Sequence, residues 1–244
     1  MDVSSDRFLD DGTRERRFTD GAPGVLWTPA TASASAPVPL VVLGHPGGLD
    51  AMLPRLEARA RQAAGLGYAS AALELPGAGD RPRLPEVDRA RGELREAVGA
   101  GRRPDDHVVD RLVLPLVEQA VPEWQALVDA VLTLPEVRDP VAVSGGVTAI
   151  GVRFALVEPR VVAASLYAGS VVPRSIVEEA RRVTVPVHVL LQWDDEGNDR
   201  QAALDLFDAL GSAQKTLQAN TGGHTGVPPY AAEDAGRFLV RHLG

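Results

Sequence analysis

Short apolar runs alternate with amphipathic stretches along most of the chain. Residues 24–28 and 38–44 are rich in apolar and β-branched side chains, as expected of strands, and the second run is apolar enough for a strand covered on both faces. Apolar positions recur at helical spacing from 54 to 66, and residues 68–73 are strand-like again. This succession of strand, helix and strand predicts a right-handed βαβ unit.

The same alternation resumes after Pro140. Strands are predicted over residues 141–143, 161–167, 185–191 and 215–218, and helices over 145–156, 175–182, 200–210 and 231–243. Repeated βα units with apolar strands predict an α/β fold whose sheet is doubly wound and mostly parallel. Ligands of such sheets bind at the carboxyl ends of the strands, so the reactive side chains are expected there.

The stretch between these two parts breaks the rhythm. Residues 85–121 predict helices outside the sheet, either a partial lid or additional helices that cover the sheet. Residues 122–134, which begin with Pro122, predict a separate helix packed on the sheet. We expect residues 1–244 to form a single domain, since α/β folds commonly exceed roughly 200 residues with one sheet.

Composition limits the chemistry that is available. The 244 residues contain no cysteine, which excludes disulfides, iron–sulfur clusters and a cysteine nucleophile. Lys215 is the single lysine among 25 basic side chains, and no P-loop pattern is present. No pair of histidines has the spacing of metal ligands, so neither a metal nor a cofactor is expected. Without cysteine, any chemistry must use oxygen groups, nitrogen groups or a cofactor.

Charge and hydropathy bear on partners and location. The net charge of −8 and an aromatic content of 5% argue against a nucleic-acid surface. No stretch holds 18 apolar residues, and the first residues lack the apolar core of a signal peptide. We therefore expect a cytoplasmic protein that binds no membrane. The sequence does not decide whether the protein forms a homodimer.

Three predicted strands are followed by reactive side chains. Ser144 follows the strand after Pro140, Asp195 and its neighbour Asp194 follow the strand 185–191, and His224 follows the strand 215–218. This chain order of Ser, Asp and His is that of α/β-hydrolase triads. A serine hydroxyl needs an imidazole to accept its proton, and the imidazole needs a carboxylate to hold its tautomer. The order thus predicts Ser144 as nucleophile, His224 as base and Asp195 as the orienting acid.

A glycine-rich segment follows the strand 38–44 and fits an oxyanion-binding role. In Gly44-His45-Pro46-Gly47-Gly48, glycine allows backbone N–H groups to approach a developing negative charge. Pro46 has no N–H, so Gly47 is the better donor, and Gly145 after the nucleophile would be the second. His45 itself is interpreted as a loop or packing residue.

Several of these segments together resemble the dienelactone-hydrolase-like group of α/β-hydrolases. The similar segments are Glu158-Pro159-Arg160-Val161, the strand 185–191 with Gln192-Trp193-Asp194-Asp195-Glu196 after it, Leu206-Phe207-Asp208-Ala209-Leu210-Gly211, and Gly222-Gly223-His224. The resemblance implies a serine hydrolase that cleaves an ester, a lactone or a related small acyl substrate without a metal. It also implies that Asp195 is the triad acid, with Asp194 as the alternative.

The nucleophile turn departs from the family pattern of Gly-x-Ser-x-Gly. Ala142-Val143-Ser144-Gly145-Gly146 satisfies a version with small residues at the flanks, but only three residues separate Pro140 from Ser144. Gly145 or Thr148 could instead stand at the tip of the turn. This irregularity leaves two other functions open, a catalytically degenerate binding protein and a non-hydrolytic lyase that uses His224 and Asp195.

Overall fold

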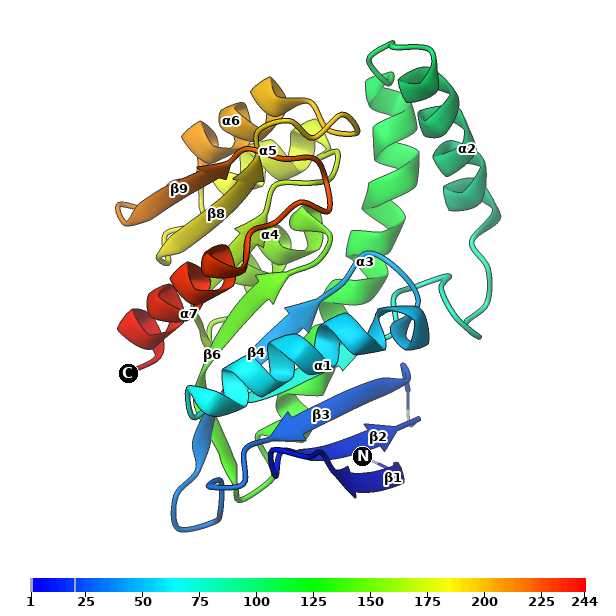
Figure 1. Ribbon diagram of the computed structural model, residues 1–244. Helices are drawn as coiled ribbons and strands as arrows, with labels where there is room; N and C mark the ends of the chain where they lie inside the picture. The colour runs from blue at the N-terminus through cyan, green and yellow to red at the C-terminus, as the bar shows by residue number, and fades with distance from the viewer. Residues whose placement is uncertain (1, 20) are drawn as a thin grey trace.

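One nine-stranded sheet runs through the molecule (Figure 1). The computed structural model describes residues 2–19 and 21–244 of the chain. The strands are β1 (Val3–Phe8), β2 (Arg14–Phe18), β3 (Gly24–Thr28), β4 (Val38–Gly44), β5 (Ala69–Leu73), β6 (Val137–Gly145), β7 (Val161–Tyr167), β8 (Val187–Gln192) and β9 (Lys215–Asn220). Their spatial order is β1-β2-β3-β5-β4-β6-β7-β8-β9, antiparallel from β1 to β5 and parallel from β5 to β9.

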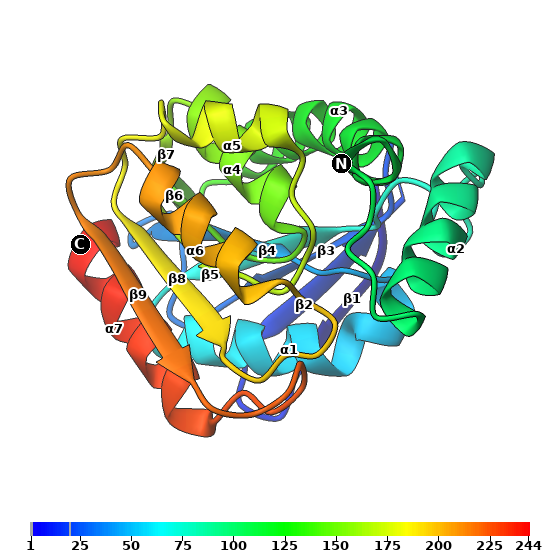
Figure 2. The same cartoon turned by 90° about the horizontal axis from the view of Figure 1, so that it is seen from above.

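Helices cover both faces of the sheet, as the view from above makes clear (Figure 2). α1 (Leu49–Gly65) and α7 (Pro229–Leu243) pack on one face, and α3 (Asp106–Val131), α4 (Thr148–Val157), α5 (Arg174–Ala180) and α6 (Arg200–Ala209) pack on the other. α2 (Pro85–Gly99) lies outside this layer against α3. The prediction of an α/β fold with a doubly wound, mostly parallel sheet is confirmed.

The strands β1 and β2 are absent from the prediction because their sequences are charged. β2 reads Arg14-Glu15-Arg16-Arg17-Phe18, yet Glu15 and Arg16 are buried in the structure. Ion pairs satisfy these charges, with Arg7 on Glu15 at 2.8 Å and Arg16 on Glu136 at 2.6 Å. In β2, charge pairs with other segments take the place of the alternating apolar residues from which a strand is ordinarily predicted.

The prediction of a separate helix over residues 122–134 is wrong. α3 runs without interruption from Asp106 to Val131 and contains both Pro115 and Pro122. Each internal proline removes a backbone donor, at a cost of about 3 kcal/mol. Buried side chains along the whole helix, including Trp124, whose ring packs edge-on against Phe154, outweigh that cost.

The Glu15 carboxylate makes the stability depend on acid pH. Burial acts to raise the pKa of Glu15, but hydrogen bonds from Arg7 and from Trp27 Nε1 outweigh it and hold the pKa below the usual 4.5. A lowered pKa in the folded state stabilises the fold above about pH 4.5, and this stabilisation is lost as the pH falls through the folded-state pKa.

We expect Arg7→Gln to lower the free energy of unfolding at pH 7 by about 1 kcal/mol, because Arg7 is half exposed and solvent screens its charge. Urea unfolding at pH 7 and pH 3 measures the effect. The difference between the variant and the wild type should be smaller at pH 3 than at pH 7, because the stabilisation is lost as the pH falls through the lowered pKa of Glu15. An equal difference at both pH values would contradict the role of the Glu15 charge.

Candidate active site

Two loops at the carboxyl ends of β8 and β9 bring His224 and Asp195 together. His224 Nδ1 lies 2.7 Å from Asp195 Oδ2, and the Asp195 carboxylate is buried. The other carboxylate oxygen, Oδ1, accepts the backbone N–H of Gly197 at 3.0 Å. An ionised carboxylate can only accept, so Nδ1 carries the proton of the pair and Nε2 is left as the basic nitrogen.

Asp194 occupies a different position in the same loop. Its Oδ2 accepts the backbone N–H of Gly222 at 3.1 Å, which ties the loop after β8 to the loop after β9. Of the two neighbouring acids, Asp195 is therefore the one that contacts the imidazole of His224.

His224 and Asp195 line a cavity of about 370 Å³. Its wall comes from the end of β4, one face of α1, the turn between β6 and α4, the end of β7 and the loop of His224. The lining residues are Gly44, His45, Pro46, Met52, Arg55, Arg59, Gly146, Val147, Tyr167, Ala168, Gly169, Ser170, Leu190, Gln192, Asp195, His224, Thr225 and Val227. A cavity of this size suits a small molecule.

Two glycines form the turn at the top of β6. Gly145 and Gly146 have φ angles of 70° and 89°, a region that favours glycine. A Cβ on Gly146 would lie 2.6 Å from the Cα of Gly44, and a Cβ on Gly44 would lie 2.5 Å from the carbonyl oxygen of Gly145. The ends of β4 and β6 therefore approach each other backbone to backbone, and the chain then enters α4 through Val147.

Ser144 lies before this turn, inside β6. The strand spans nine residues rather than the three predicted, and Ser144 pairs with Leu43 on one side and Ser165 on the other. Arg59 Nη2 donates to the Ser144 carbonyl oxygen at 2.6 Å and to its hydroxyl oxygen at 3.2 Å. Ser144 does not line the cavity, and within the described ranges it makes no hydrogen bond with His224. The structure thus brings His224 and Asp195 together but not Ser144.

Thr148, the alternative nucleophile, has its hydroxyl engaged. Thr148 Oγ1 donates to the carbonyl oxygen of Tyr167 at 2.7 Å and accepts from Ser170 Oγ at 3.1 Å. The Thr148 backbone N–H donates to the same Ser170 oxygen at 3.3 Å. These contacts fix the first turn of α4 against the end of β7.

The predicted oxyanion donors, Gly47 and Gly145, do not line the cavity of His224. Gly47 lines a neighbouring cavity of about 250 Å³, together with Gly77 and Gly79. Val147 lines both cavities and so stands between Gly47 and His224.

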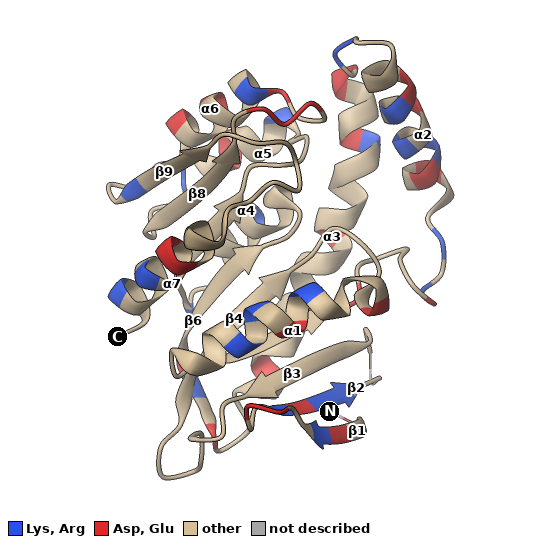
Figure 3. Ribbon diagram, in the orientation of Figure 1, with Lys and Arg blue, Asp and Glu red and all other residues tan. Residues whose placement is uncertain are grey.

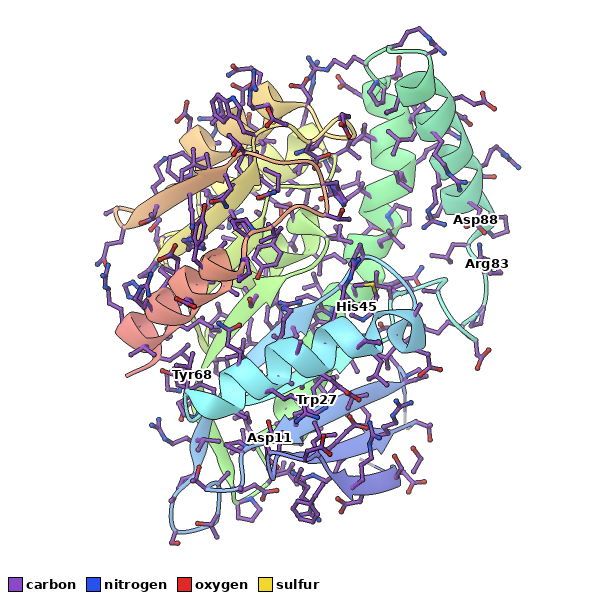
Figure 4. The ribbon with its side chains drawn as sticks, in the orientation of Figure 1. Asp11, Trp27, His45, Tyr68, Arg83 and Asp88 are labelled. Carbon is purple, nitrogen blue, oxygen red and sulfur yellow. The ribbon has the colours of Figure 1, made fainter. Side chains whose placement is uncertain are left out.

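His45, labelled in Figure 4, packs at the end of β4. Its Nε2 bonds the carbonyl oxygen of Leu73 at 2.7 Å, which matches the packing role interpreted from the sequence. Burial lowers the pKa of His45 and thus favours its neutral form.

Arg59 is a site residue that the sequence analysis missed. The helix predicted over 54–66 rests on its apolar positions and gives Arg59 no role, whereas in the structure Arg59 lines the cavity with Met52 and Arg55. The three positions are separated by three and four residues and thus share one helix face. That spacing is the only signal in the sequence, and it does not say what the face contacts.

The segment 85–121 contributes nothing to the lining of the His224 cavity. Arg103, Pro104, Asp106 and Val109 instead line a separate cavity of about 280 Å³, which shares Ala168 and Ser170 with the first. The lid therefore stays a prediction, whereas the part of this segment that belongs to α3 packs on the sheet.

No helix within residues 2–19 and 21–244 combines the length and apolar character needed to cross a membrane. In the same ranges no group of three His, Cys, Asp or Glu side chains is arranged to hold a metal ion.

Comparison with known proteins relates this architecture to esterases. No family model matches the chain, and no curated protein does. A solved structure of a cold-adapted esterase from an Arctic intertidal metagenomic library is 28% identical, covers 99% of this chain and 98% of its own, and superposes with a TM-score of 0.76. TT1662 from Thermus thermophilus shares the fold at 19% identity, with 95% of this chain and 98% of its own covered and a TM-score of 0.66. Acetyl xylan esterase from Paenibacillus sp. R4 shares it at 17% identity, with 99% of this chain and 88% of its own covered and a TM-score of 0.65. The chain has the α/β-hydrolase fold.

In the α/β-hydrolase fold the nucleophile stands on the strained turn between a strand and the following helix. The corresponding turn here lies between β6 and α4, where Val147 is the residue before the helix. Val147 has a relaxed φ of −71°, and no non-glycine residue of the described chain has a positive φ. The tip of this turn therefore carries an apolar, unstrained side chain.

Proposed function

We propose that the protein hydrolyses ester bonds of a small acyl substrate, with His224 and Asp195 acting on water rather than on a serine. The observation that carries this proposal is the hydrogen bond between His224 Nδ1 and Asp195 Oδ2 at the wall of a ligand-sized cavity. The 28% identity to a solved esterase over nearly the whole of both chains supports the reaction class. The relaxed Val147 at the turn supports a mechanism without an acyl-enzyme.

The hydrolysis would proceed in two steps. His224 Nε2 removes a proton from water while the water oxygen bonds to the ester carbonyl carbon, and the carbonyl oxygen becomes an oxyanion. Asp195 stabilises the imidazolium that forms. The intermediate then collapses, its carbon–oxygen bond to the alcohol breaks, and the imidazolium returns a proton to the leaving alkoxide. Acid and alcohol are the products, and His224 is regenerated.

Two alternatives have specific support. The chain order of Ser144, Asp195 and His224 favours an acyl-enzyme on Ser144, provided that the strand end rearranges to free its hydroxyl. The valine at the turn favours a binding protein that keeps the cavity without catalysis. The three functions predict different results for labelling by a serine-directed probe and for hydrolysis of a model ester.

Treatment with a fluorophosphonate probe and assay with p-nitrophenyl acetate separate these three functions. We expect the wild type to hydrolyse the ester without covalent labelling, and Ser144→Ala to retain its activity within about threefold, since Ser144 lies outside the cavity. Labelling that disappears in Ser144→Ala would establish the acyl-enzyme instead. Absence of hydrolysis of acetyl, butyryl and lactone substrates by the folded wild type would favour the binding protein.

A further inference from the structure

Arg59 places a positive charge in the wall of the His224 cavity without a carboxylate beside it. Its guanidinium donates to the carbonyl oxygen of Gly44 at 2.8 Å and to both oxygens of Ser144. No ion pair of Arg59 occurs within 4.0 Å in the part of the chain that the structure describes. Other half-buried arginines differ, for example Arg81 on Glu123 and Arg160 on Glu158.

Burying the Arg59 guanidinium in this way destabilises the folded protein unless another group compensates its charge. Removing a guanidinium from water costs several kcal/mol, and two carbonyl oxygens supply only partial charges in return. Burial lowers the pKa of Arg59, but arginine stays protonated in proteins. The face of Tyr167, whose ring centroid lies 5.6 Å from the guanidinium carbon, contributes a further attraction of about 0.5–2 kcal/mol, the upper end applying where water is excluded. The site is therefore suited to a negative charge that arrives from the cavity.

The Arg59 guanidinium also has N–H donors that no described protein group accepts. Arginine has five N–H groups, and the three hydrogen bonds above use one from Nη1 and two from Nη2. Nε–H and the second N–H of Nη1 have no protein acceptor among the described residues. The Arg59 side chain lines the cavity, so a ligand there can approach the guanidinium.

The backbone donors that would ordinarily bind an oxyanion are not available in this cavity. Pro46 at the end of β4 has no N–H. The N–H of Thr148, the residue after the turn, is engaged by Ser170 Oγ. Gly47 faces the neighbouring cavity on the other side of Val147.

We infer that the Arg59 guanidinium binds the oxyanion that forms when water attacks the ester carbonyl in the His224 cavity. This inference rests on the proposed function and adds its missing element, a group that stabilises negative charge in the transition state. The positive charge is held in place by Gly44 and Ser144 before the substrate enters. It therefore needs little reorganisation when the oxyanion develops. Figure 3 colours the basic residues of α1, the helix that carries Arg59, in blue.

Two substitutions separate charge from hydrogen bonding. Arg59→Gln keeps N–H donors for the two strand ends but removes the charge, whereas Arg59→Lys keeps the charge on a shorter donor. We expect Arg59→Gln to lower kcat for p-nitrophenyl acetate about 10²-fold with KM within threefold, because the charge acts in the transition state. Arg59→Lys should retain about ten times more kcat than Arg59→Gln. Arg61→Gln is the matched control, since Arg61 is on the same helix but pairs with Asp11 outside the cavity.

Circular dichroism and thermal melting establish that each variant is folded. A kcat of folded Arg59→Gln within threefold of the wild type would overturn the inference while the proposed function stands. Equal losses in Arg59→Gln and Arg59→Lys, in parallel with a lower Tm, would assign Arg59 a merely structural role and would also overturn it.

Binding of methylphosphonate, a tetrahedral anion, distinguishes failure of the inference from failure of the proposed function. We expect isothermal titration to detect binding to the wild type and at least tenfold weaker binding to Arg59→Gln. If the wild type hydrolyses no ester, the proposed function fails, and methylphosphonate binding that depends on Arg59 would still identify the anion-binding group. Equal binding by wild type and Arg59→Gln, or no binding by either, would overturn the assignment of Arg59.

Discussion

His224→Ala is expected to reduce kcat/KM for p-nitrophenyl acetate by about 10³-fold. The substitution removes the only group of the Asp195 pair that can accept a proton from water, and general-base catalysis contributes about 10²–10⁴-fold. The fold should be unaffected, because the His224 side chain is 60% exposed and makes a single side-chain hydrogen bond. Initial rates and the Tm of the same preparation measure both effects.

His107→Ala is the matched control for this experiment. His107 is exposed at the start of α3 and does not line the cavity. Its replacement should leave the rate within twofold of the wild type. Equal rates for His224→Ala and the wild type would exclude His224 as the base, whatever the nucleophile is.

Gly146→Ala is expected to destabilise the protein by about 3 kcal/mol. The new Cβ would lie 2.6–2.9 Å from backbone atoms of Gly44 and His45, which cannot move aside without separating β4 from β6. A left-handed φ of 89° adds strain of about 1–3 kcal/mol for a residue with a Cβ, and overpacking adds a similar amount. In a chain of this size the Tm should fall by about 6–12 °C, which calorimetry measures.

Gly92→Ala also replaces glycine by alanine, but at this position the structure predicts that the protein becomes more stable. Gly92 lies inside α2, and a Cβ there meets no atom within 4 Å. Alanine in a helix interior is favoured over glycine by about 1 kcal/mol, so the Tm should rise slightly. A Gly146→Ala variant as stable as Gly92→Ala would contradict the close approach of β4 and β6.

The parallel half of the sheet was predictable from sequence because its signals are local. Long apolar strands such as Val161–Tyr167 alternate with amphipathic helices, and the predicted bounds of this strand match those of β7. β2 was not predictable, since its buried charges depend on partners in other segments of the chain. Glu136, the partner of Arg16, is one such case.

The site was predictable where it depends on strand ends and not where it depends on the register of a turn. His224 and Asp195 follow strands in loops, so any fold of this class brings them to the same edge. Ser144 and Val147 are three residues apart, and the positive φ angles of Gly145 and Gly146 decide which of them stands at the tip. Arg59 depends on packing between a helix and two strand ends, for which the sequence carries no local pattern.

The edge strand β1 is held to the sheet in an unusual way. All six of its residues are exposed, so it buries little apolar surface. Besides the backbone ladder with β2, ion pairs hold it: Asp6 with Arg14, and Arg7 with Glu15 and with Glu57 of α1. Dissolved salt screens exposed ion pairs but not apolar contacts. Raising the ionic strength is therefore expected to weaken the attachment of this first strand, chiefly through the pairs Asp6–Arg14 and Arg7–Glu57, because the buried Glu15 carboxylate is screened less.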